Sequence, residues 1–354
     1  METQVLTFTE PSTGCEGQVA EGHYLETTDG LFFAVKGFVH PPSRFVAILR
    51  YASDSHRGNR EKNGRHYRRL YHFDEQEQLL REQYPHYLVF DTTCQAALQS
   101  VPHEYLKQIY DPSARLLDLL DQENLEPVER DAVGFARLLQ QEAQVPWSSL
   151  GLSGSLLIGL HTPSSDLDLQ VGGVQSSWAV QQALKRLLAG ETGEVRPLDE
   201  QGVQELYTSR VADTRLSLSD FVGSEREKVI QGRFRERPYF IRFLKAPTEV
   251  DEKYGDRLYI PLGRVGIGAT VTDAGEAIFT PCRYAVDKVR FLGDPQVEGL
   301  SEIVSFRGRF CEQAQAGDVV QACGTLERVQ VKDGRSWHRL LLGNHPEDTM
   351  LVRR

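Results

Sequence analysis

Two carboxylates, Asp166 and Asp168, stand two residues apart and follow a Gly154-Ser155 pair after a spacer of ten residues. The alternation of polar and apolar residues over 166–171 predicts a strand, and side chains two apart on a strand project from the same face. Carboxylates at such close range repel each other unless a cation lies between them. Mg²⁺ prefers hard oxygen ligands and keeps waters and phosphates in its shell. We therefore expect Asp166 and Asp168 to bind Mg²⁺ or Mn²⁺.

The Gly154-Ser155 pair follows a short strand-like segment, residues 150–153. Glycine has no Cβ to obstruct a ligand, and the backbone N–H groups of a turn that begins a helix can hold phosphates. Together with the carboxylate pair, this turn predicts a site for a magnesium-bound nucleoside triphosphate and in-line transfer of a phosphoryl or nucleotidyl group. The alternative is an ordinary surface strand that carries Asp166 and Asp168 by chance.

The order of strand, Gly-Ser, spacer and Asp-Leu-Asp resembles the core motif of the polymerase-beta-type nucleotidyltransferase superfamily. The resemblance is close over residues 150–171 and looser over residues 113–245. Gly159 and the ending at residues 165–168 resemble the minimal bacterial and archaeal members. The arrangement of the whole chain also resembles a prokaryotic, mainly archaeal-type group of predicted nucleotidyltransferases with a β-rich N-terminal domain.

This resemblance implies that Asp166 and Asp168 are the catalytic metal ligands and that Gly154, Ser155 and Ser165 bind the nucleotide. It implies a magnesium-dependent nucleotidyltransferase that moves a nucleoside monophosphate from an NTP to an RNA or DNA acceptor. Two alternatives stay open. One is adenylylation of a protein or small-molecule acceptor, as in minimal antitoxin-type members. The other is a non-catalytic module that binds nucleotide or nucleic acid.

The chain departs from the family pattern at the third carboxylate, which members that transfer nucleotides bring from a later strand. The strand expected at residues 237–244 carries Arg242 instead. If Arg242 faces the site, it would contact nucleotide phosphates, as arginine commonly does; the alternative is a solvated arginine. Four acids elsewhere are candidates for the missing carboxylate: Glu194, Asp199, Glu236 and Glu249.

Residues 57–69 form a basic run with six Arg or Lys and one Glu, although the whole chain has a net charge of −10. Basic residues interleaved with aromatic ones can neutralise phosphates while rings stack on bases. The run therefore predicts a nucleic-acid-binding element, and the alternative is a solvated, flexible hairpin tip. Its candidate contact residues are Arg57, Arg60, Lys62, Arg65, Arg68 and Arg69.

The elements that would position these residues predict an α+β protein with a central polymerase-beta-like nucleotidyltransferase core between two β-rich domains. At about 100–200 residues per domain, 354 residues suggest two or three domains. We place an N-terminal β-rich domain at 1–112, the core at 113–247 and a small barrel-like domain at 248–354. Hydrophobic spacing of three to four residues predicts helices at 127–143 and 178–189.

Alternation and turn residues predict short strands throughout both β-rich domains. A Pro-Pro break separates two N-terminal runs, 30–40 and 44–50, and so predicts a hairpin or meander. The C-terminal barrel would present residues 306–310 to single-stranded nucleic acid, or serve only in dimerisation or structure. Its expected strands are 265–271, 277–279, 303–306, 319–326 and 338–342, with turns at 272–275 and 332–334.

Bulk properties narrow the class of protein. No apolar stretch is long enough for a transmembrane helix, and the N-terminus lacks the pattern of a signal peptide, so we expect a cytoplasmic protein that does not enter a membrane. The five cysteines form no CxxC pair, which favours reduced thiols over a zinc site or a disulfide framework. The sequence does not predict the oligomeric state or which NTP is used.

Overall fold

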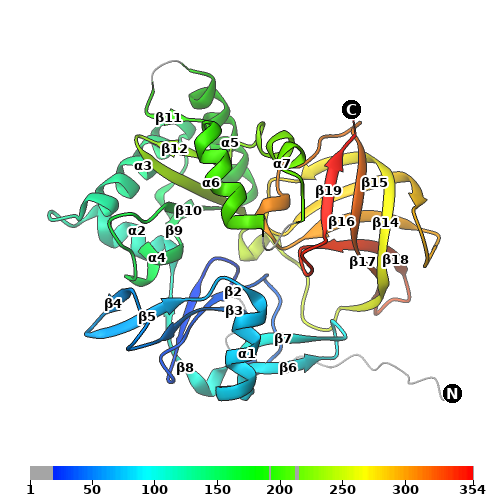
Figure 1. The fold of residues 1–354 in the computed structure, drawn as a ribbon, viewed down its shortest axis with the longest axis horizontal. Coiled ribbons are helices and arrows are strands. Elements are labelled where there is room, and N and C mark those ends of the chain that lie inside the picture. Colours follow the sequence, from blue (N-terminus) through cyan, green and yellow to red (C-terminus); the bar gives the residue numbers. More distant parts are fainter. Residues whose placement is uncertain (1–18, 191–192, 212–214, 354) are drawn as a thin grey trace.

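Three β-sheets organise the chain, and their strands come from three successive parts of the sequence (Figure 1). The computed structural model describes residues 19–190, 193–211 and 215–353. Strands of the first sheet lie between residues 24 and 110, those of the second between 150 and 244, and those of the third between 257 and 352. With seven α-helices in the described ranges, the chain is a mixed protein consistent with the α+β prediction.

The first sheet is antiparallel and follows the order β4-β5-β3-β2-β1-β8, with β7 also paired to β3 and β6 paired to β7. The predicted N-terminal hairpin is present as β2 and β3. Helix α1, Phe73–Gln83, connects β5 to β6. The strands are β1 Tyr24–Thr27, β2 Phe32–Val35, β3 Arg44–Ser53, β4 Arg60–Lys62, β5 Arg65–Arg69, β6 Leu88–Asp91, β7 Ala96–Pro102 and β8 Leu106–Tyr110.

The two faces of this sheet bury different neighbours because alternate strand residues point to opposite sides. One face packs Phe33 and Leu49 with Leu80 of α1 to form the core of the first domain. The other face packs Phe32 and Tyr67, among others, against Leu157, Ile158 and Leu160 of the central region. The first domain is therefore docked through an apolar face onto the segment that follows Gly154.

The second sheet has the order β11-β12-β13-β10-β9, in which only the central pair β10 and β13 is parallel. Its strands are β9 Leu150–Leu152, β10 Leu167–Gly172, β11 Val195–Arg196, β12 Gln231–Phe234 and β13 Arg237–Leu244. The helices of this region are α2 Pro112–Leu120, α3 Pro127–Ala143, α4 Gly154–Ile158, α5 Val174–Ala189, α6 Glu200–Arg210 and α7 Leu218–Glu225.

Helix α3 has strong local signals at both ends, which is why its bounds could be predicted from the sequence. A capping box joins Glu126 and Glu129 at its start, and Pro127 occupies the first turn, where its missing N–H costs nothing. The helix ends at Ala143 and is capped by Gln144, whose φ of 53° is left-handed. Its bounds are the predicted ones, whereas α5 begins four residues before the predicted start at residue 178.

The third sheet closes into a five-stranded barrel, which agrees with the predicted architecture. Strand β14 pairs with both β15 and β17, so the circuit β14-β15-β16-β18-β17 is continuous, and β19 is added to β17. The β16–β18 pair is parallel. The strands are β14 Arg257–Glu276, β15 Cys282–Phe291, β16 Leu300–Ser305, β17 Val319–Val331, β18 Ser336–Leu342 and β19 Thr349–Val352.

Two local predictions in the barrel are wrong. Residues 272–275 do not reverse the chain but continue β14, where the register shifts on both sides of Asp273. The Asp and Gly residues there mark β-bulges, in which Asp273 accepts a hydrogen bond from the Gly275 N–H at 2.9 Å. Residues 277–279 are a buried turn with a single bridge from Phe279 to Phe243 of β13, so their apolar character reflects burial rather than a strand.

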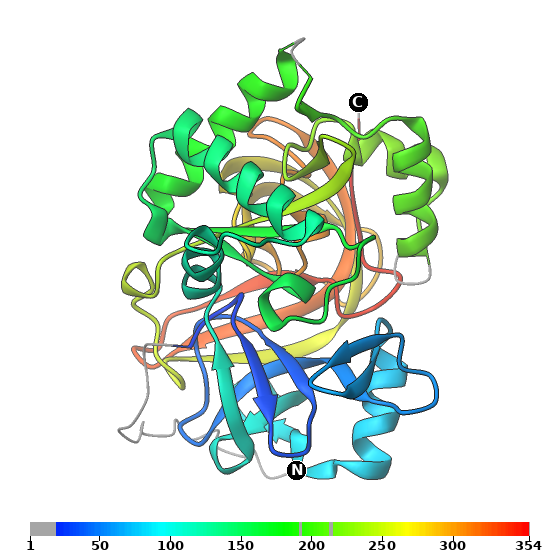
Figure 2. The same ribbon diagram turned by 90° about the vertical axis from the view of Figure 1, so that its left-hand side faces the viewer.

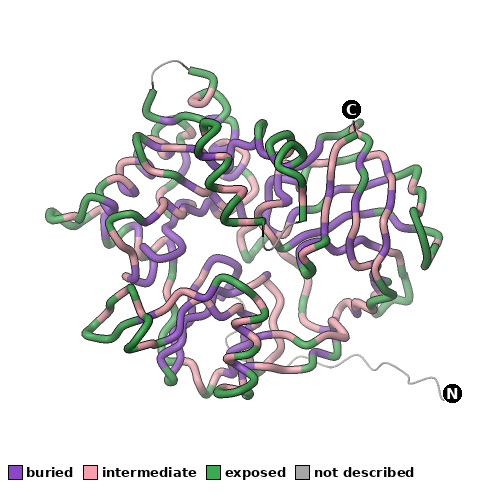
Figure 3. Tube along the Cα trace, in the orientation of Figure 1, coloured by how far each residue is buried: buried purple, intermediate pink, exposed green. Residues whose placement is uncertain are grey.

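The three domains surround a common centre (Figures 1 and 2). The central domain and the barrel share one hydrophobic core, and Glu312 accepts hydrogen bonds from the Val229 and Ile230 N–H groups across their boundary. The first domain lies against both, and Figure 3 shows buried segments in all three.

Within the described ranges, no helix has the length and apolar character needed to cross a membrane.

Cys94, Cys282, Cys311 and Cys323 are free thiols, and Cys15 lies outside the described residues.

Candidate functional site

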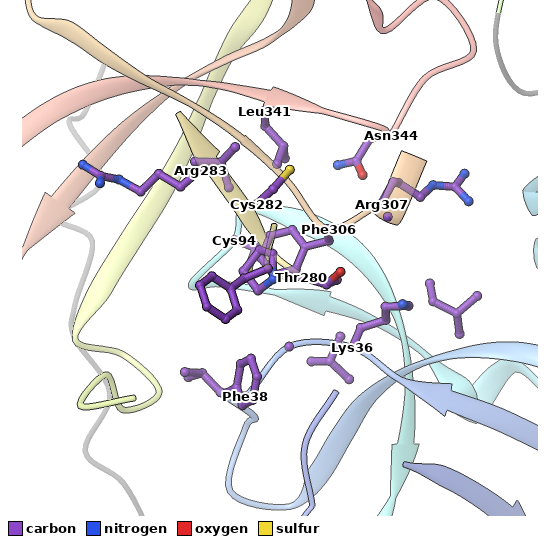
Figure 4. A pocket seen from close by; sticks show the side chains of 18 of the residues that line it. Lys36, Phe38, Cys94, Thr280, Cys282, Arg283, Phe306, Arg307, Leu341 and Asn344 are labelled. Carbon is purple, nitrogen blue, oxygen red and sulfur yellow. The ribbon is translucent and has the colours of Figure 1, made fainter. Parts of the chain in front are cut away.

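A cavity of about 1090 Å³ lies where the three domains meet. The first domain contributes Lys36 and Arg50 to its wall, the central domain contributes Asp168, and the barrel contributes Phe306 and Trp337. Figure 4 shows Lys36 on one side of this space, across from barrel residues that include Phe306. The cavity therefore joins the predicted carboxylate site to the inner side of the barrel domain.

Gly154 packs directly against the carboxylate of Asp168. The Ser153 N–H donates to the Asp168 carbonyl at 2.8 Å, which fixes the start of α4 beside β10. A Cβ built on Gly154 would lie 2.0 Å from Asp168 Oδ2, and the φ of Gly154 is +58°. Only glycine fits this position, because any side chain would collide with the carboxylate and would adopt a left-handed backbone. Ser153, Gly154 and Asp168 all line the cavity.

Asp166 immediately precedes β10, which begins at Leu167 rather than at the predicted residue 166. Burial and the neighbouring charge of Asp166 raise the pKa of Asp168 to about 6, although Arg69, Arg242 and Arg50 oppose the shift. A carboxylate whose ionised form is disfavoured by a neighbouring negative charge is one that a bound cation would stabilise.

The donor set fits Mg²⁺ in one specific mode. In the described part of the chain, no three His, Cys, Asp or Glu side chains gather into a cluster that could hold a metal ion by themselves. Mg²⁺ commonly binds through one or two carboxylates and takes its remaining ligands from water and substrate phosphates. Asp166 and Asp168 would hold the ion in that mode, with an open cavity beside Asp168 for the phosphates.

Ser155 and Ser165 are both buried and contact each other, with their hydroxyl oxygens 3.3 Å apart. Ser165 Oγ also accepts a hydrogen bond from the Thr162 N–H at 2.9 Å. From outside this loop, Arg237 donates to the Pro163 carbonyl at 2.6 Å while its Nε contacts Asp131 at 2.7 Å. The serine hydroxyls therefore hold the loop that leads into Asp166, and neither serine lines the cavity.

Arg242 lines the cavity, which meets the condition set for its predicted contact with nucleotide phosphates. In the parallel register of β10 and β13, Phe240 lies opposite Asp168 and Arg242 lies opposite Gln170. The Arg242 guanidinium is 3.4 Å from Glu21 of the first domain, and its Nε is buried with no hydrogen-bond partner among the described residues. The strand beside Asp168 thus supplies a ring and a cation where the family pattern has an acid.

None of the four acids that the sequence offers as a third carboxylate is available beside Asp168. Glu236 pairs with Arg196 at 2.7 Å, and Glu194 pairs with Arg235 at 3.1 Å. Asp199 accepts a hydrogen bond from the Gly202 N–H as the cap of α6. Glu249 lines the cavity but accepts hydrogen bonds from the Val174 and Ala246 N–H groups.

The predicted nucleic-acid-binding run includes strands β4 and β5, and four of its six basic residues contact other parts of the protein. Arg60 donates to the Leu160 carbonyl and Lys62 to the Ile158 carbonyl, each at 2.6 Å. Arg68 contacts Asp54 and Glu75, and Arg57 is 3.5 Å from Asp54. Arg65 is exposed, and Arg69 lines the cavity. The hairpin therefore braces the segment after Gly154 instead of extending freely into solvent.

Sequence reasoning missed two cavity residues of the first domain and a buried acid that bonds one of them. Arg50 and Lys36 line the cavity, and buried Glu21 bonds Lys36 at 2.7 Å and the Gly37 N–H at 2.7 Å. The sequence feature that could have drawn attention to Arg50 is its place at the end of the otherwise apolar run 45–50. That signal carried no information about Asp168, since the two residues are brought together only by the docking of two domains.

Comparison with known proteins places the chain in a family without assigning an activity. Over 331 residues it is 32% identical to the uncharacterized protein MJ1086 of Methanocaldococcus jannaschii, and the match covers 92% of this chain and 95% of that protein. The chain belongs to the same family as this archaeal protein. No family model matches the chain, and no solved structure matches it.

Proposed function

We propose that the chain is a magnesium-dependent nucleotidyltransferase of the polymerase-beta type that transfers a nucleoside monophosphate from an NTP to a nucleic-acid acceptor. The observation that carries this proposal is the packing of Gly154 against Asp168 at the wall of a cavity large enough for a nucleotide. The charge of Asp166 is close enough to influence the ionisation of Asp168. A site for a metal-bound triphosphate needs carboxylates that bind the metal and a turn that binds the phosphates. Here the turn at Gly154 is in contact with Asp168.

A bound magnesium ion would neutralise phosphate oxygens and act as a Lewis acid. Asp166 and Asp168 would hold that ion, and the first turn of α4 would present backbone N–H groups to the phosphates. Transfer forms a bond between the acceptor oxygen and the α-phosphorus, breaks the α–β phosphoanhydride bond and releases pyrophosphate. The acceptor proton leaves to water, because no carboxylate on the described β13 lies opposite Asp168 to receive it.

The barrel side of the cavity supports a nucleic-acid acceptor. Two of its arginines are already paired with acids, since Arg339 pairs with Glu327 at 2.7 Å and Arg283 pairs with Glu302. The rings of Phe306 and Trp337 line the same wall. A wall that combines aromatic rings with neutralised charge suits base stacking better than the binding of a free anion.

The proposal is tested by incubating the purified protein with each radiolabelled NTP, Mg²⁺ or Mn²⁺, and a pool of tRNA and single-stranded DNA. The parent should label an acceptor, and Asp166→Asn and Asp168→Asn should reduce labelling by at least about 100-fold while remaining folded. Glu123→Gln, at an exposed position in the same domain, controls for loss of a carboxylate. Undiminished labelling by Asp168→Asn would exclude the proposed site.

The second candidate function is a non-catalytic nucleotide-binding module. It is favoured by one observation, that Phe240 and Arg242 occupy the β13 positions nearest the site and no acid does. This alternative predicts saturable NTP binding that depends on Asp166 and Asp168, with no labelled product from any acceptor. Adenylylation of a protein or small molecule would instead give a product only when that acceptor is supplied.

A further inference from the structure

Three arginines from two domains line the cavity together with Asp168. Arg50 of β3 and Arg69 of β5 line the cavity together with Arg242 of β13. These three side chains come from two domains and line the same cavity as Asp168. The first domain therefore contributes directly to the space beside the carboxylate pair.

A β-bulge aims Arg50 into this space. The register of β2 and β3 pairs Phe32 with Tyr51 and Phe33 with Leu49, so Arg50 is the extra, unpaired residue of β3. Bulges redirect side chains and are frequent beside functional sites. Arg69 is paired with Tyr51 on the neighbouring strand, which places the two arginines at adjacent positions of the sheet.

The positive charge of this cluster is only partly compensated. Glu21 is committed to Lys36 at 2.7 Å and lies 3.4 Å from Arg242. Among the described residues, Arg50 has no carboxylate within 4.0 Å, and no ion pair of that length joins Asp168 to an arginine. The arginines thus face Asp168 across a gap instead of closing onto it.

Two buried guanidinium nitrogens in the cluster are unsatisfied. Nε of Arg69 and Nε of Arg242 are inaccessible to solvent and have no hydrogen-bond partner within the described chain. An unpaired buried donor of a charged group is costly. The side chains that carry these two nitrogens line the cavity, where a phosphate could bind a guanidinium group through charge-assisted hydrogen bonds. Arginine is well suited to this role because its planar fork matches phosphate geometry.

We propose that Arg50, Arg69 and Arg242 form a cradle for a chain of phosphates, so that the first domain completes the triphosphate site that begins at Gly154 and Asp168. This inference rests on the proposed function for the identity of the ligand. The net charge of the site supports this proposal. A triphosphate adds about four negative charges to those of the two carboxylates, and one divalent metal ion leaves the site with a negative net charge. Three arginines bring the site close to neutrality.

The test is calorimetric titration of metal-free protein with inorganic tripolyphosphate, which requires neither metal nor acceptor. Wild-type protein should bind it saturably, and Arg50→Gln and Arg69→Gln should each weaken binding by at least about tenfold. Asp168→Asn should tighten binding, because it removes a repelling charge from the opposite wall. Arg81→Gln, an exposed arginine of the same domain, should bind like wild type. Circular dichroism and thermal melting establish that each variant is folded.

A second arm separates the triphosphate from the sugar–phosphate backbone of a nucleic acid. A short single-stranded oligonucleotide without terminal phosphate is titrated into the same variants. Loss of tripolyphosphate binding with unchanged oligonucleotide binding supports the cradle as stated. Wild-type tripolyphosphate affinity in the Arg50→Gln/Arg69→Gln double variant, no binding by wild type, or loss confined to the oligonucleotide would overturn it. If no acceptor is ever labelled but tripolyphosphate binds as described, the proposed function fails and the cradle remains.

Discussion

Gly154 and Asp168 are in contact across the space that a Cβ would occupy, with 2.0 Å between that position and Asp168 Oδ2. The contact joins the turn that begins α4 to the strand that carries the carboxylate. A substitution at either residue therefore changes the position of the other, and the two halves of the site cannot vary independently.

Gly154→Ala should abolish transfer and lower the free energy of unfolding. The left-handed backbone alone costs alanine about 1–2 kcal/mol, and the collision with Asp168 adds to it. Gly159→Ala is the matched control, since Gly159 has a φ of +66° and its nearest neighbour to an added Cβ is Lys62 Nζ at 4.0 Å. Urea unfolding and transfer assays should show the larger loss in both quantities for Gly154→Ala. Equal losses in the two variants would mean that the Gly154 contact has no special role.

Asp168→Asn should stabilise the metal-free protein at pH 7.5. Because the pKa of Asp168 is raised to about 6, mainly by burial and Asp166, its ionised form is disfavoured in the folded state. The penalty is absent below about pH 4, grows as pH rises toward 6 and is complete above that, so the stabilisation by Asn should follow the same course. Thermal melting between pH 4 and 8, with Glu123→Gln as control, measures it. A variant that is less stable than the parent at pH 7.5 contradicts the account.

Arg237→Gln should slow transfer by about tenfold or more while changing the KM for NTP little, because Arg237 holds the loop before Asp166 through the Pro163 carbonyl. Arg235→Gln tests whether the shared ion pair matters instead, since Arg235 also contacts Asp131 but does not bond the loop. Steady-state kinetics of the two variants distinguishes these cases. Similar kcat values for both would assign the effect to Asp131.

Lys62→Ala should lower stability as well as any nucleic-acid affinity, because its ammonium group donates to the Ile158 carbonyl at 2.6 Å and to Tyr110 Oη at 2.8 Å. Loss of these hydrogen bonds should cost about 1–3 kcal/mol. The exposed Arg65 provides the comparison: Arg65→Ala should leave the melting temperature unchanged and reduce only oligonucleotide affinity. If Lys62→Ala melts like the parent, the hairpin does not brace the segment after Gly154.

Local patterns were sufficient to predict the elements with strong local signals. Strand β13 has the predicted bounds, as does α3, whose capping box and apolar spacing lie within the helix itself. The proximity of Asp166 and Asp168 followed from two-residue spacing, and the barrel from regularly spaced short strands. In β14 the same Asp and Gly signals accompany bulges, because a long strand that pairs on two sides must bend.

The cation-lined wall of the cavity could not be predicted in the same way. Arg50 and Asp168 are far apart in the sequence and belong to different sheets, which are brought together by tertiary contacts such as the packing of Phe32 and Tyr67 against Leu157. The basic run predicts Arg69 as a nucleic-acid contact, but the position of Arg69 in the same cavity as Asp168 depends on these tertiary contacts. A run of charged residues shows only that basic side chains are close together in the sequence. It does not indicate which of these side chains will line a cavity.

The most direct test of nucleotidyl transfer compares two labels on the same NTP. With the α-phosphate labelled, the account predicts that radioactivity enters the acceptor in the presence of Mg²⁺ and that Asp168→Asn prevents it. With the γ-phosphate labelled, it predicts that radioactivity is released only as pyrophosphate. Label from the γ-phosphate in the acceptor, or release of orthophosphate without acceptor labelling, would contradict nucleotidyl transfer at this site.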